Sequence, residues 1–251
     1  MSDSASPMNL ADGDDPQMQR AYAVARLNFR YFWREVVRDR SRIVPALGLA
    51  AVKAPFRDPG RRAKKPGAPD VEHMWLSDVD YDGREVSGVL LNSPNHLRSV
   101  KEGDAVRVPV ADLSDWLYAI GDDAFGGFTV NLLRSRMGAA ERREHDAAWG
   151  LSFGDPLKPR RVPDREHQTL TDNLAEVLRE TLARQPGLLT ARGLNGWTAL
   201  NQEASAGGVA TTRVLLAAGA DRAATTDQGL TPLDLARTLG WTEVADLFAM
   251  R

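Results

Sequence analysis

Cysteine is absent from the sequence, and this absence removes several kinds of chemistry together. Disulfide bonds, thiolate metal sites and cysteine nucleophiles are all excluded. A chain without thiols suits a reducing compartment, so we expect a cytoplasmic protein.

Long apolar runs are missing too. The longest one, residues 43–52, contains Pro45 and Gly48 and is far shorter than the ~20 residues of a membrane-spanning helix. The first residues are rich in Ser and Asp, where a secretory signal has a basic region followed by an apolar one. We therefore expect no transmembrane segment, no export by that route and no membrane partner.

The chain also lacks an excess of charge of either sign. It has 32 Lys and Arg against 34 Asp and Glu, so its net charge of -2 gives no general attraction to nucleic acid. Two local basic features are a stripe on the first predicted helix and the loop 57–67. Acidic residues interrupt the stripe and no aromatic residue interleaves the loop, so we interpret both as solvated surface, with phosphate contact as the alternative. The stripe consists of Arg26, Arg30, Arg34 and Arg38.

The length of 251 residues favours two domains, because single domains usually span ~100–200 residues. Repeated prolines between residues 154 and 163 cannot continue a helix or a central strand, so we place a linker there. The predicted division is a disordered tail (1–15), an α+β domain (16–154), a linker (155–165) and an ankyrin-repeat domain (166–251).

The N-terminal domain shows alternating helix and strand signals. Asp15 and Pro16 are typical of a helix start, and apolar residues then recur at a period of 3.6 along one face. We predict strands at 48–56, 71–79, 85–91, 105–110 and 128–133, with an Asp-Gly hairpin turn at 80–83, and a helix at 139–149. The fold class is a small, mainly antiparallel sheet with flanking helices. The predicted core face of the first helix is Tyr22, Ala25, Phe29, Phe32, Trp33 and Val36.

A repeat of 33 residues is the clearest signal of the C-terminal part. The segment 195–200 (NGWTAL) recurs as 228–233 (QGLTPL), and Gly207 recurs as Gly240. A period of 33 residues and the intervening VLLAAGAD at 214–221 resemble ankyrin repeats. With a degenerate first half-repeat upstream, the resemblance implies about two and a half units of an all-α domain.

Ankyrin proteins bind partners through their turn tips and concave face, so the resemblance implies a protein partner here. Trp197 and Leu230 occupy the variable tip positions, where large apolar side chains suit a contact hot spot. The equally weighted alternative is that Trp197 folds back on its own chain. Asn201 and Asp234 stand where the family often has a capping His, and Glu203 replaces a small core Ala, which suggests solvent access or a partner group.

The stack is also short. Ankyrin units bury apolar surface only against neighbours, and about three or more are normally needed for independent stability. We therefore predict that it docks on the N-terminal domain, with residues 175–184 and the preceding linker at the junction.

A second resemblance covers most of residues 20–154. It rests on the residues Glu72-His73-Met74-Trp75-Leu76, Gly88, Asn92-Ser93-Pro94, Gly103-Asp104, Ser114-Asp115-Trp116 and Gly126-Gly127-Phe128-Thr129. In this order they resemble the YegJ-like bacterial family of unknown function. The likeness implies a fold grouping and no reaction.

An enzyme is the alternative function. Glu72, His73, Asp104 and Asp115 are types that a general acid/base or metal site uses. The four histidines, however, show no paired metal-ligand spacing, and adjacent Glu72 and His73 would point to opposite faces of a strand. Each aspartate also suits a turn or a cap. Phosphate-binding glycine loops, nucleophile elbows and kinase motifs are missing, so we expect no metal and no cofactor.

The sequence therefore predicts a non-catalytic protein–protein interaction protein of bacterial type, in the form of an immunity or adaptor protein. Its partner-binding candidates are Trp197, Leu230, Asn201, Glu203 and Asp234. The alternative is a hydrolase or ligand-binding enzyme that uses ankyrin repeats for targeting. The two differ in whether the four acid/base candidates meet in one pocket.

Overall fold

The computed structural model describes residues 15–59 and 70–249, so the predicted tail and most of the basic loop lie outside it. Residue contacts divide the chain into two compact units. Among the described residues, the N-terminal unit comprises 15–28, 46–59, 70–79 and 88–160, and the C-terminal unit comprises 29–45, 80–87 and 161–249. The predicted domain boundaries stay a prediction, because the first helix and one hairpin contribute to both units.

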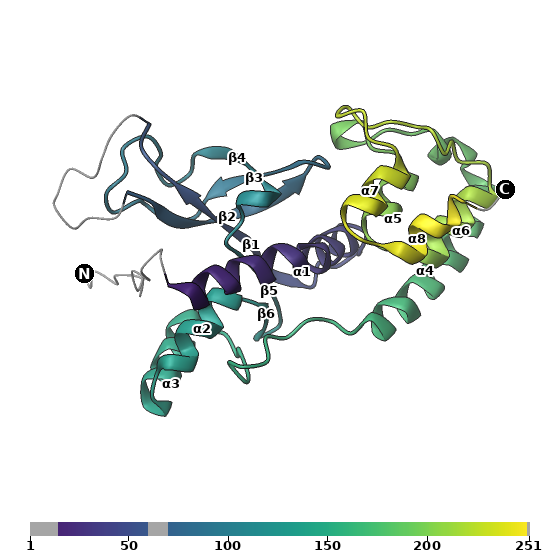
Figure 1. The fold of residues 1–251 in the computed structure, drawn as a ribbon. Coiled ribbons are helices and arrows are strands. Elements are labelled where there is room, and N and C mark those ends of the chain that lie inside the picture. The colour runs from purple at the N-terminus through teal and green to yellow at the C-terminus, as the bar shows by residue number, and fades with distance from the viewer. Residues whose placement is uncertain (1–14, 60–69, 250–251) are drawn as a thin grey trace. The chain divides into compact units, whose positions relative to one another are not determined.

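Helix α1 (Pro16–Arg40) begins where the sequence predicts (Figure 1). The Asp15 carboxylate accepts the Gln17 N–H at 2.8 Å and so caps the first turn. The predicted core face is confirmed, since all six of its residues are buried. No helix among the described residues is long and apolar enough to cross a membrane.

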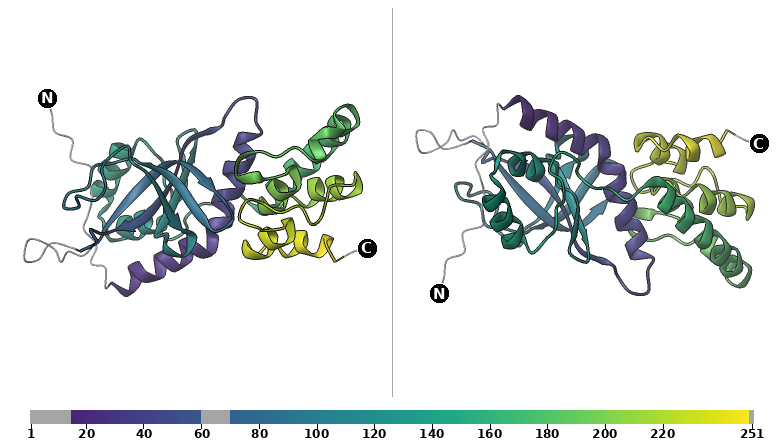
Figure 2. Two further views of the ribbon diagram at one scale, coloured as in Figure 1. Left: turned by 90° about the horizontal axis from the view of Figure 1, so that it is seen from above. Right: turned by 90° about the horizontal axis from the view of Figure 1, so that it is seen from below.

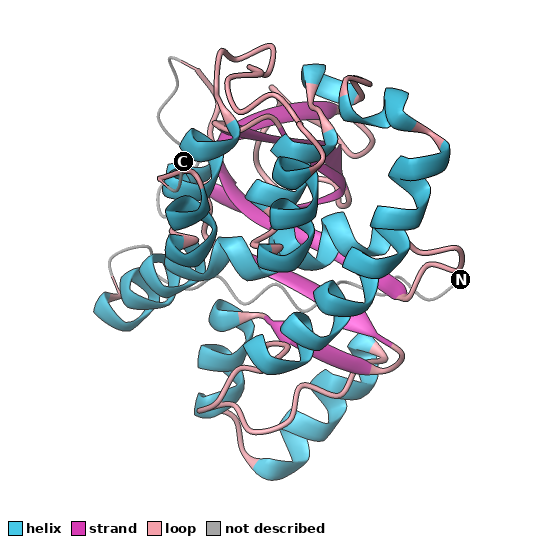
Figure 3. Ribbon diagram, turned by 90° about the vertical axis from the view of Figure 1, so that its right-hand side faces the viewer, coloured by secondary structure: helices cyan, strands magenta, loops and turns pink. Residues whose placement is uncertain are grey.

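The six strands within the described residues, magenta in Figure 3, form one sheet. Their order in the sheet is β4-β3-β2-β1-β5-β6. Central β1 pairs antiparallel with β2 and β5, and Val52 lies opposite Leu76 on one side and Trp116 on the other. The predicted antiparallel sheet with helices is thus observed. The strands are β1 (Leu47–Phe56), β2 (Glu72–Tyr81), β3 (Glu85–Leu90), β4 (Ala105–Pro109), β5 (Asp115–Ile120) and β6 (Asp123–Gly126), and a short 3-10 helix spans Val110–Asp112.

The predicted strand at 128–133 is wrong, because these residues form helix α2 (Phe128–Arg136). Gly126 and Gly127 both have positive φ, which ends β6 and turns the chain. A Cβ on Gly126 would lie 2.3 Å from the Trp116 ring, so only glycine fits there. The Asp115 carboxylate then accepts the N–H groups of Phe128 (2.9 Å) and Thr129 (2.8 Å), which fixes the start of a helix.

Helix α3 (Ala139–Trp149) has the predicted bounds and ends at Gly150, which is left-handed. Neighbouring residues of β5 point to opposite faces of the sheet. The indole N–H of Trp116 donates to Ala25 of α1 at 2.9 Å, whereas Leu117 packs with Val130 of α2 and Phe153. In the N-terminal unit the sheet therefore lies between α1 on one face and α2 with α3 on the other.

The C-terminal part is helical, as predicted (Figure 2). Contacts join α4 to α6, α5 to α7 and α6 to α8, so the helices stack in chain order. An ankyrin architecture for this stack stays a prediction. The helices are α4 (Asp164–Arg184), α5 (Ala199–Ser205), α6 (Val209–Ala217), α7 (Pro232–Thr238) and α8 (Thr242–Leu247), with 3-10 turns at Pro186–Leu189 and Leu194–Gly196.

The stack packs against the second half of α1 within the C-terminal unit. Trp33 donates its indole N–H to Ser205 Oγ at 3.0 Å, and Tyr31 packs edge-on against Trp241. The end of the predicted linker also contacts this part of α1, because Arg34 donates to the Val162 carbonyl at 2.8 Å. The buried side chains of 175–184 pack into the stack with α5 and α6, and a junction of this segment with the N-terminal domain stays a prediction.

Candidate functional site

The four acid/base candidates of the N-terminal unit have separate partners. Glu72 is buried, and its carboxylate accepts three backbone N–H groups, from Asn95 (2.7 Å), His96 (2.5 Å) and Leu97 (3.0 Å). Three consecutive backbone donors bind this one buried carboxylate, so the loop that carries them is held against β2. Glu72 therefore serves to fix the loop after β3.

His73 belongs to a different hydrogen-bonded chain. Ser114 donates its hydroxyl proton to the Lys53 carbonyl at 3.0 Å, so it must accept from His73 Nδ1 at 2.9 Å. His73 Nε2 is then left to accept from the Tyr22 hydroxyl at 3.4 Å. Burial, helped by the Lys53 charge, lowers the pKa of His73 to about 4, which keeps the ring neutral.

This arrangement differs from a Ser-His catalytic pair. In such a pair the serine gives its proton to histidine, whereas Ser114 gives its proton to a backbone carbonyl. Ser114 is also only 1% exposed. The sequence pattern placed Tyr22 on a core face and Ser114 in a family motif, but it did not connect them or Lys53 with His73, because these residues lie on separate elements.

The two aspartates have the structural roles that the sequence offered as alternatives. Asp115 is fully buried and caps α2, and it also accepts the Thr129 hydroxyl at 2.6 Å. Asp104 accepts the Lys101 N–H at 2.9 Å in the turn at Gly103, which has a φ of 84°. Among the described residues, no group of three or more His, Asp or Glu side chains could hold a metal ion.

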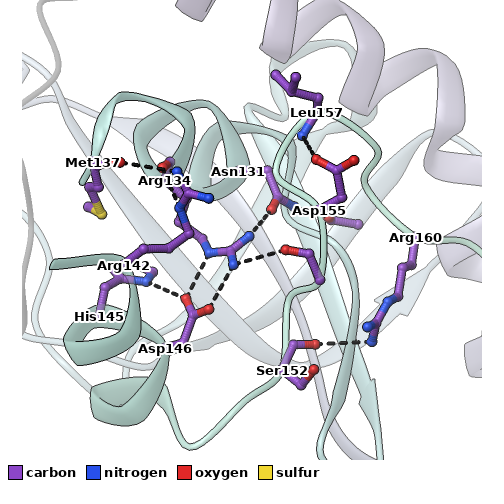
Figure 4. A network of polar contacts seen from close by, with 12 residues as sticks. Asn131, Arg134, Met137, Arg142, His145, Asp146, Ser152, Asp155, Leu157 and Arg160 are labelled. Carbon is purple, nitrogen blue, oxygen red and sulfur yellow. Dashed lines mark hydrogen bonds and ion pairs between the residues drawn. The ribbon is translucent and has the colours of Figure 1, made fainter. Parts of the chain in front are cut away.

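A network around Arg134 escaped the sequence analysis entirely (Figure 4). Its buried guanidinium forms two 2.7 Å hydrogen bonds to Asp146 of α3, one of 2.6 Å to Asn131 and one of 3.1 Å to the Gly154 carbonyl. A fully paired buried guanidinium organises the segments around it. This network joins α2, α3 and the chain that leaves the N-terminal unit.

The interpretation of the arginine stripe as a solvated face is wrong for its second half. Arg34 is fully buried and pairs with Glu35 and Asp164, each at 2.9 Å. Arg38 is 2% exposed and forms a bidentate pair with Glu203, at 2.8 and 2.7 Å. Buried guanidinium groups need such partners, so this half of the stripe serves the C-terminal unit and does not face a phosphate.

Of the two interpretations of Trp197, the structure supports the second, in which the side chain folds back on its own chain. Trp197 is 4% exposed and packs edge-on against Trp33 and Tyr81. Leu230 is half-buried and faces Gly83, where an added Cβ would lie 2.4 Å from it. Both tip residues contact the hairpin 80–87 or α1 of their own unit.

The other predicted binding residues also have partners within the chain. Asn201 accepts the Thr198 N–H (2.9 Å) and hydroxyl (2.7 Å), and Asp234 accepts the same groups of Thr231 at 2.9 and 2.6 Å. Thr198 with Asn201, and Thr231 with Asp234, each form a capping box at the start of a helix. The Thr231 hydrogen bonds lower the pKa of Asp234. Glu203 accepts hydrogen bonds from both terminal nitrogens of buried Arg38, which explains why a carboxylate replaces a small residue here.

A cleft lies beside these contacts, within the C-terminal unit. It encloses about 260 Å³, and its lining comes from α1, the hairpin 80–87 and the first repeat. Two of the predicted partner-binding residues line it, and so does exposed Leu194. The lining residues are Trp33, Val37, Arg40, Ser41, Asp80, Tyr81, Leu194, Asn195, Trp197, Gln202 and Glu203.

Comparison with known proteins places these features in a family. The family model described as an uncharacterized protein conserved in bacteria (DUF2314) matches residues 15–153. The chain is 39% identical over 249 residues to a "Putative ankyrin repeat protein" of Neisseria meningitidis serogroup B, covering 96% of each chain. It is 39% identical over 83 residues to the uncharacterized protein YegJ of Escherichia coli, covering 33% of this chain and 48% of that protein. The chain belongs to the DUF2314 family.

Proposed function

We propose that this is a non-catalytic binding protein whose C-terminal helix pairs form an ankyrin-type module that recognises a protein partner. The observation that carries the proposal is the repetition of one local structure at the 33-residue spacing. Thr198 with Asn201 and Thr231 with Asp234 form equivalent capping boxes, and Gly207 and Gly240 both have positive φ after the helix. A repeat of this length is typical of stacked binding modules.

The name of the Neisseria meningitidis relative supports this proposal, and the alignment covers both the N-terminal and the C-terminal part of this chain. We further propose that the protein acts as an immunity or adaptor protein. Either role requires a complementary surface and no catalytic group. A binding role also fits the hydrogen bonds of the four acid/base candidates, because each already has partners within the chain: Glu72, His73, Asp104 and Asp115.

The hydrolase alternative has less support from the described residues. Its four candidate side chains belong to four separate hydrogen-bonded groups. Glu72 binds the loop after β3, and His73 contacts Tyr22 of α1. Asp104 lies in a turn, and Asp115 caps the start of α2. A general acid/base site needs its groups to converge on one reacting atom.

Affinity capture tests the proposal directly. The full chain is used as bait in a lysate of its native host, and any stoichiometric partner is purified and recombined with it. We expect one protein to re-form a complex, with chemical cross-links to residues 186–249. Cross-links confined to 15–28, 46–59, 70–79 and 88–160 would assign binding to the N-terminal unit. A host lysate without a stoichiometric partner would contradict the proposal.

A further inference from the structure

The cleft of the C-terminal unit has ionic groups that are already paired with each other. The Asp80 carboxylate accepts hydrogen bonds from the Arg40 guanidinium at 2.8 Å and from the Asn195 amide at 2.7 Å. The Arg40 guanidinium also lies over the Trp33 ring, 5.2 Å from its centre. Glu203, the other carboxylate of the cleft, is held by Arg38. A charged ligand would therefore meet groups whose charges are already balanced by each other.

One residue of the cleft lining, Trp197, has a side-chain donor without an acceptor. The C-terminal unit has three tryptophans, and two of them donate their indole N–H to Ser205, Trp33 to its hydroxyl at 3.0 Å and Trp241 to its carbonyl at 2.8 Å. The Nε1 of Trp197 is buried and has no acceptor among the described residues. Leaving a buried N–H unpaired destabilises the folded state. An acceptor supplied by a ligand would remove this cost.

The rim and the size of the cleft limit what that ligand can be. Leu194, at the rim, is 70% exposed although it is a large apolar residue. A volume of about 260 Å³ is smaller than the ~300–1,000 Å³ of typical small-molecule pockets. The space suits one or two residues of a protein chain better than a complete cofactor.

We infer that this cleft receives an uncharged anchor of the protein partner: one apolar side chain packed on Leu194, with a neighbouring backbone carbonyl that accepts the Trp197 N–H. The inference rests on the proposed function, since it names the place and the chemistry of that contact. A buried apolar anchor beside one satisfied polar group is the usual form of an interface hot spot. Trp197, at the tip position, thus contributes to binding through its indole N–H while its ring packs inside the chain.

The test uses the full chain and a phage-displayed library of random peptides as the probe. Enriched peptides are synthesised, and their Kd is measured against the wild type, Leu194→Ser and Leu157→Ser. Leu157 is the matched control because it is a leucine with similar exposure, 79%, in the N-terminal unit. The Trp197 indole N–H is followed by 15N NMR and is assigned by its loss in Trp197→Phe.

We expect the enriched peptides to share one apolar position. Leu194→Ser should weaken them about tenfold, whereas Leu157→Ser should leave Kd unchanged. Binding should also slow solvent exchange of the Trp197 N–H. A charged anchor, an unchanged Kd in Leu194→Ser, an unaffected Trp197 resonance or the failure of any peptide to enrich would each overturn the inference.

The native partner separates this inference from the proposed function. A captured protein that binds Leu194→Ser as tightly as the wild type would leave the binding function intact and remove the cleft from it. Peptides that depend on Leu194, without any native partner, would support the cleft as a peptide site and contradict the proposed function.

Discussion

The two helix pairs α5–α6 and α7–α8 share one local design but differ at the residues that face their surroundings. Glu203 in the first pair corresponds to Ala236 in the second, 33 residues later. Ala236 is fully buried in an apolar cluster, whereas Glu203 holds the buried Arg38 of α1. A small residue suffices where helix packs on helix, but a carboxylate is needed where the repeat contacts a buried guanidinium.

The helix caps differ in the same way. Asn201 is completely buried and also donates its amide N–H to the Ala224 carbonyl at 3.3 Å. Asp234, in the equivalent place, is only half-buried. An amide can donate as well as accept, so it suits the enclosed repeat, and a carboxylate suits the repeat that is nearer to solvent.

The largest effect is expected from Glu203→Ala, which makes the first pair like the second. Arg38 would stay buried without its bidentate partner, and breaking a buried pair from one side costs about 3–5 kcal/mol. The free energy of unfolding in guanidinium chloride, followed by circular dichroism, measures this loss.

Two further variants sharpen that result. Adding Arg38→Met should recover most of the stability, because an apolar side chain needs no ionic partner. Glu176→Ala is the control, since its ion pair with Arg179 is exposed, and it should cost less than about 1 kcal/mol. Equal losses in Glu203→Ala and Glu176→Ala would show that the buried pair does not hold α1 to the stack.

Asn201→Asp should have the next largest effect, about 2 kcal/mol at neutral pH. The new carboxylate would be fully buried and would face the Ala224 carbonyl instead of donating to it. Thermal unfolding checks this. Asn201→Ser, which keeps a capping oxygen without adding charge, is the matched variant and should cost less. The reverse order would contradict the burial argument.

Acid should destabilise both units, because each contains one buried histidine that stays neutral in the folded state. Burial lowers the pKa of His167 to about 3, with the Arg34 charge adding to the effect, and burial lowers that of His73 to about 4. Between these values and ~6.5 the unfolded chain binds protons that the folded chain does not, so stability is lost as pH falls through this window.

The expected loss is about 1 kcal/mol per pH unit from pH 6.5 downward for each histidine. Urea unfolding at a series of pH values measures this slope for the wild type and His167→Gln. We expect a shallower slope in His167→Gln, with His96→Gln, at an exposed position, as the control. Identical slopes in all three proteins would exclude buried His167 as the cause.

The smallest effect is expected from Asp234→Asn, about 0.5 kcal/mol at neutral pH. The Thr231 hydrogen bonds lower the pKa of Asp234 below the ordinary value of 3.8, so the carboxylate stabilises the folded state above that value. This contribution is lost as pH falls through the folded pKa. Melting curves from pH 5 to pH 3 should therefore show less acid dependence in Asp234→Asn than in the wild type.

Local patterns predicted much of the N-terminal unit and the repeats. The start of α1, its core face, the hairpin and the bounds of α3 all follow from periodicity and capping residues near in sequence. The sequence predicts a strand at 128–133 because the segment follows a Gly-Gly turn, but the residues form a helix that has its cap elsewhere in the chain. That cap is Asp115, thirteen positions before the helix starts, and only the folded sheet brings it there.

The sequence by itself determined the 33-residue repeat, the turns that close it, the absence of thiol chemistry and the balance of charge. Tertiary structure alone decided which buried charges pair, where Trp197 packs and which donor of the cleft has no acceptor. The physical reason is distance along the chain. A turn or a helix face is specified by neighbouring residues, whereas Arg38 and Glu203 come from segments 165 positions apart, and nothing in either segment specifies the other.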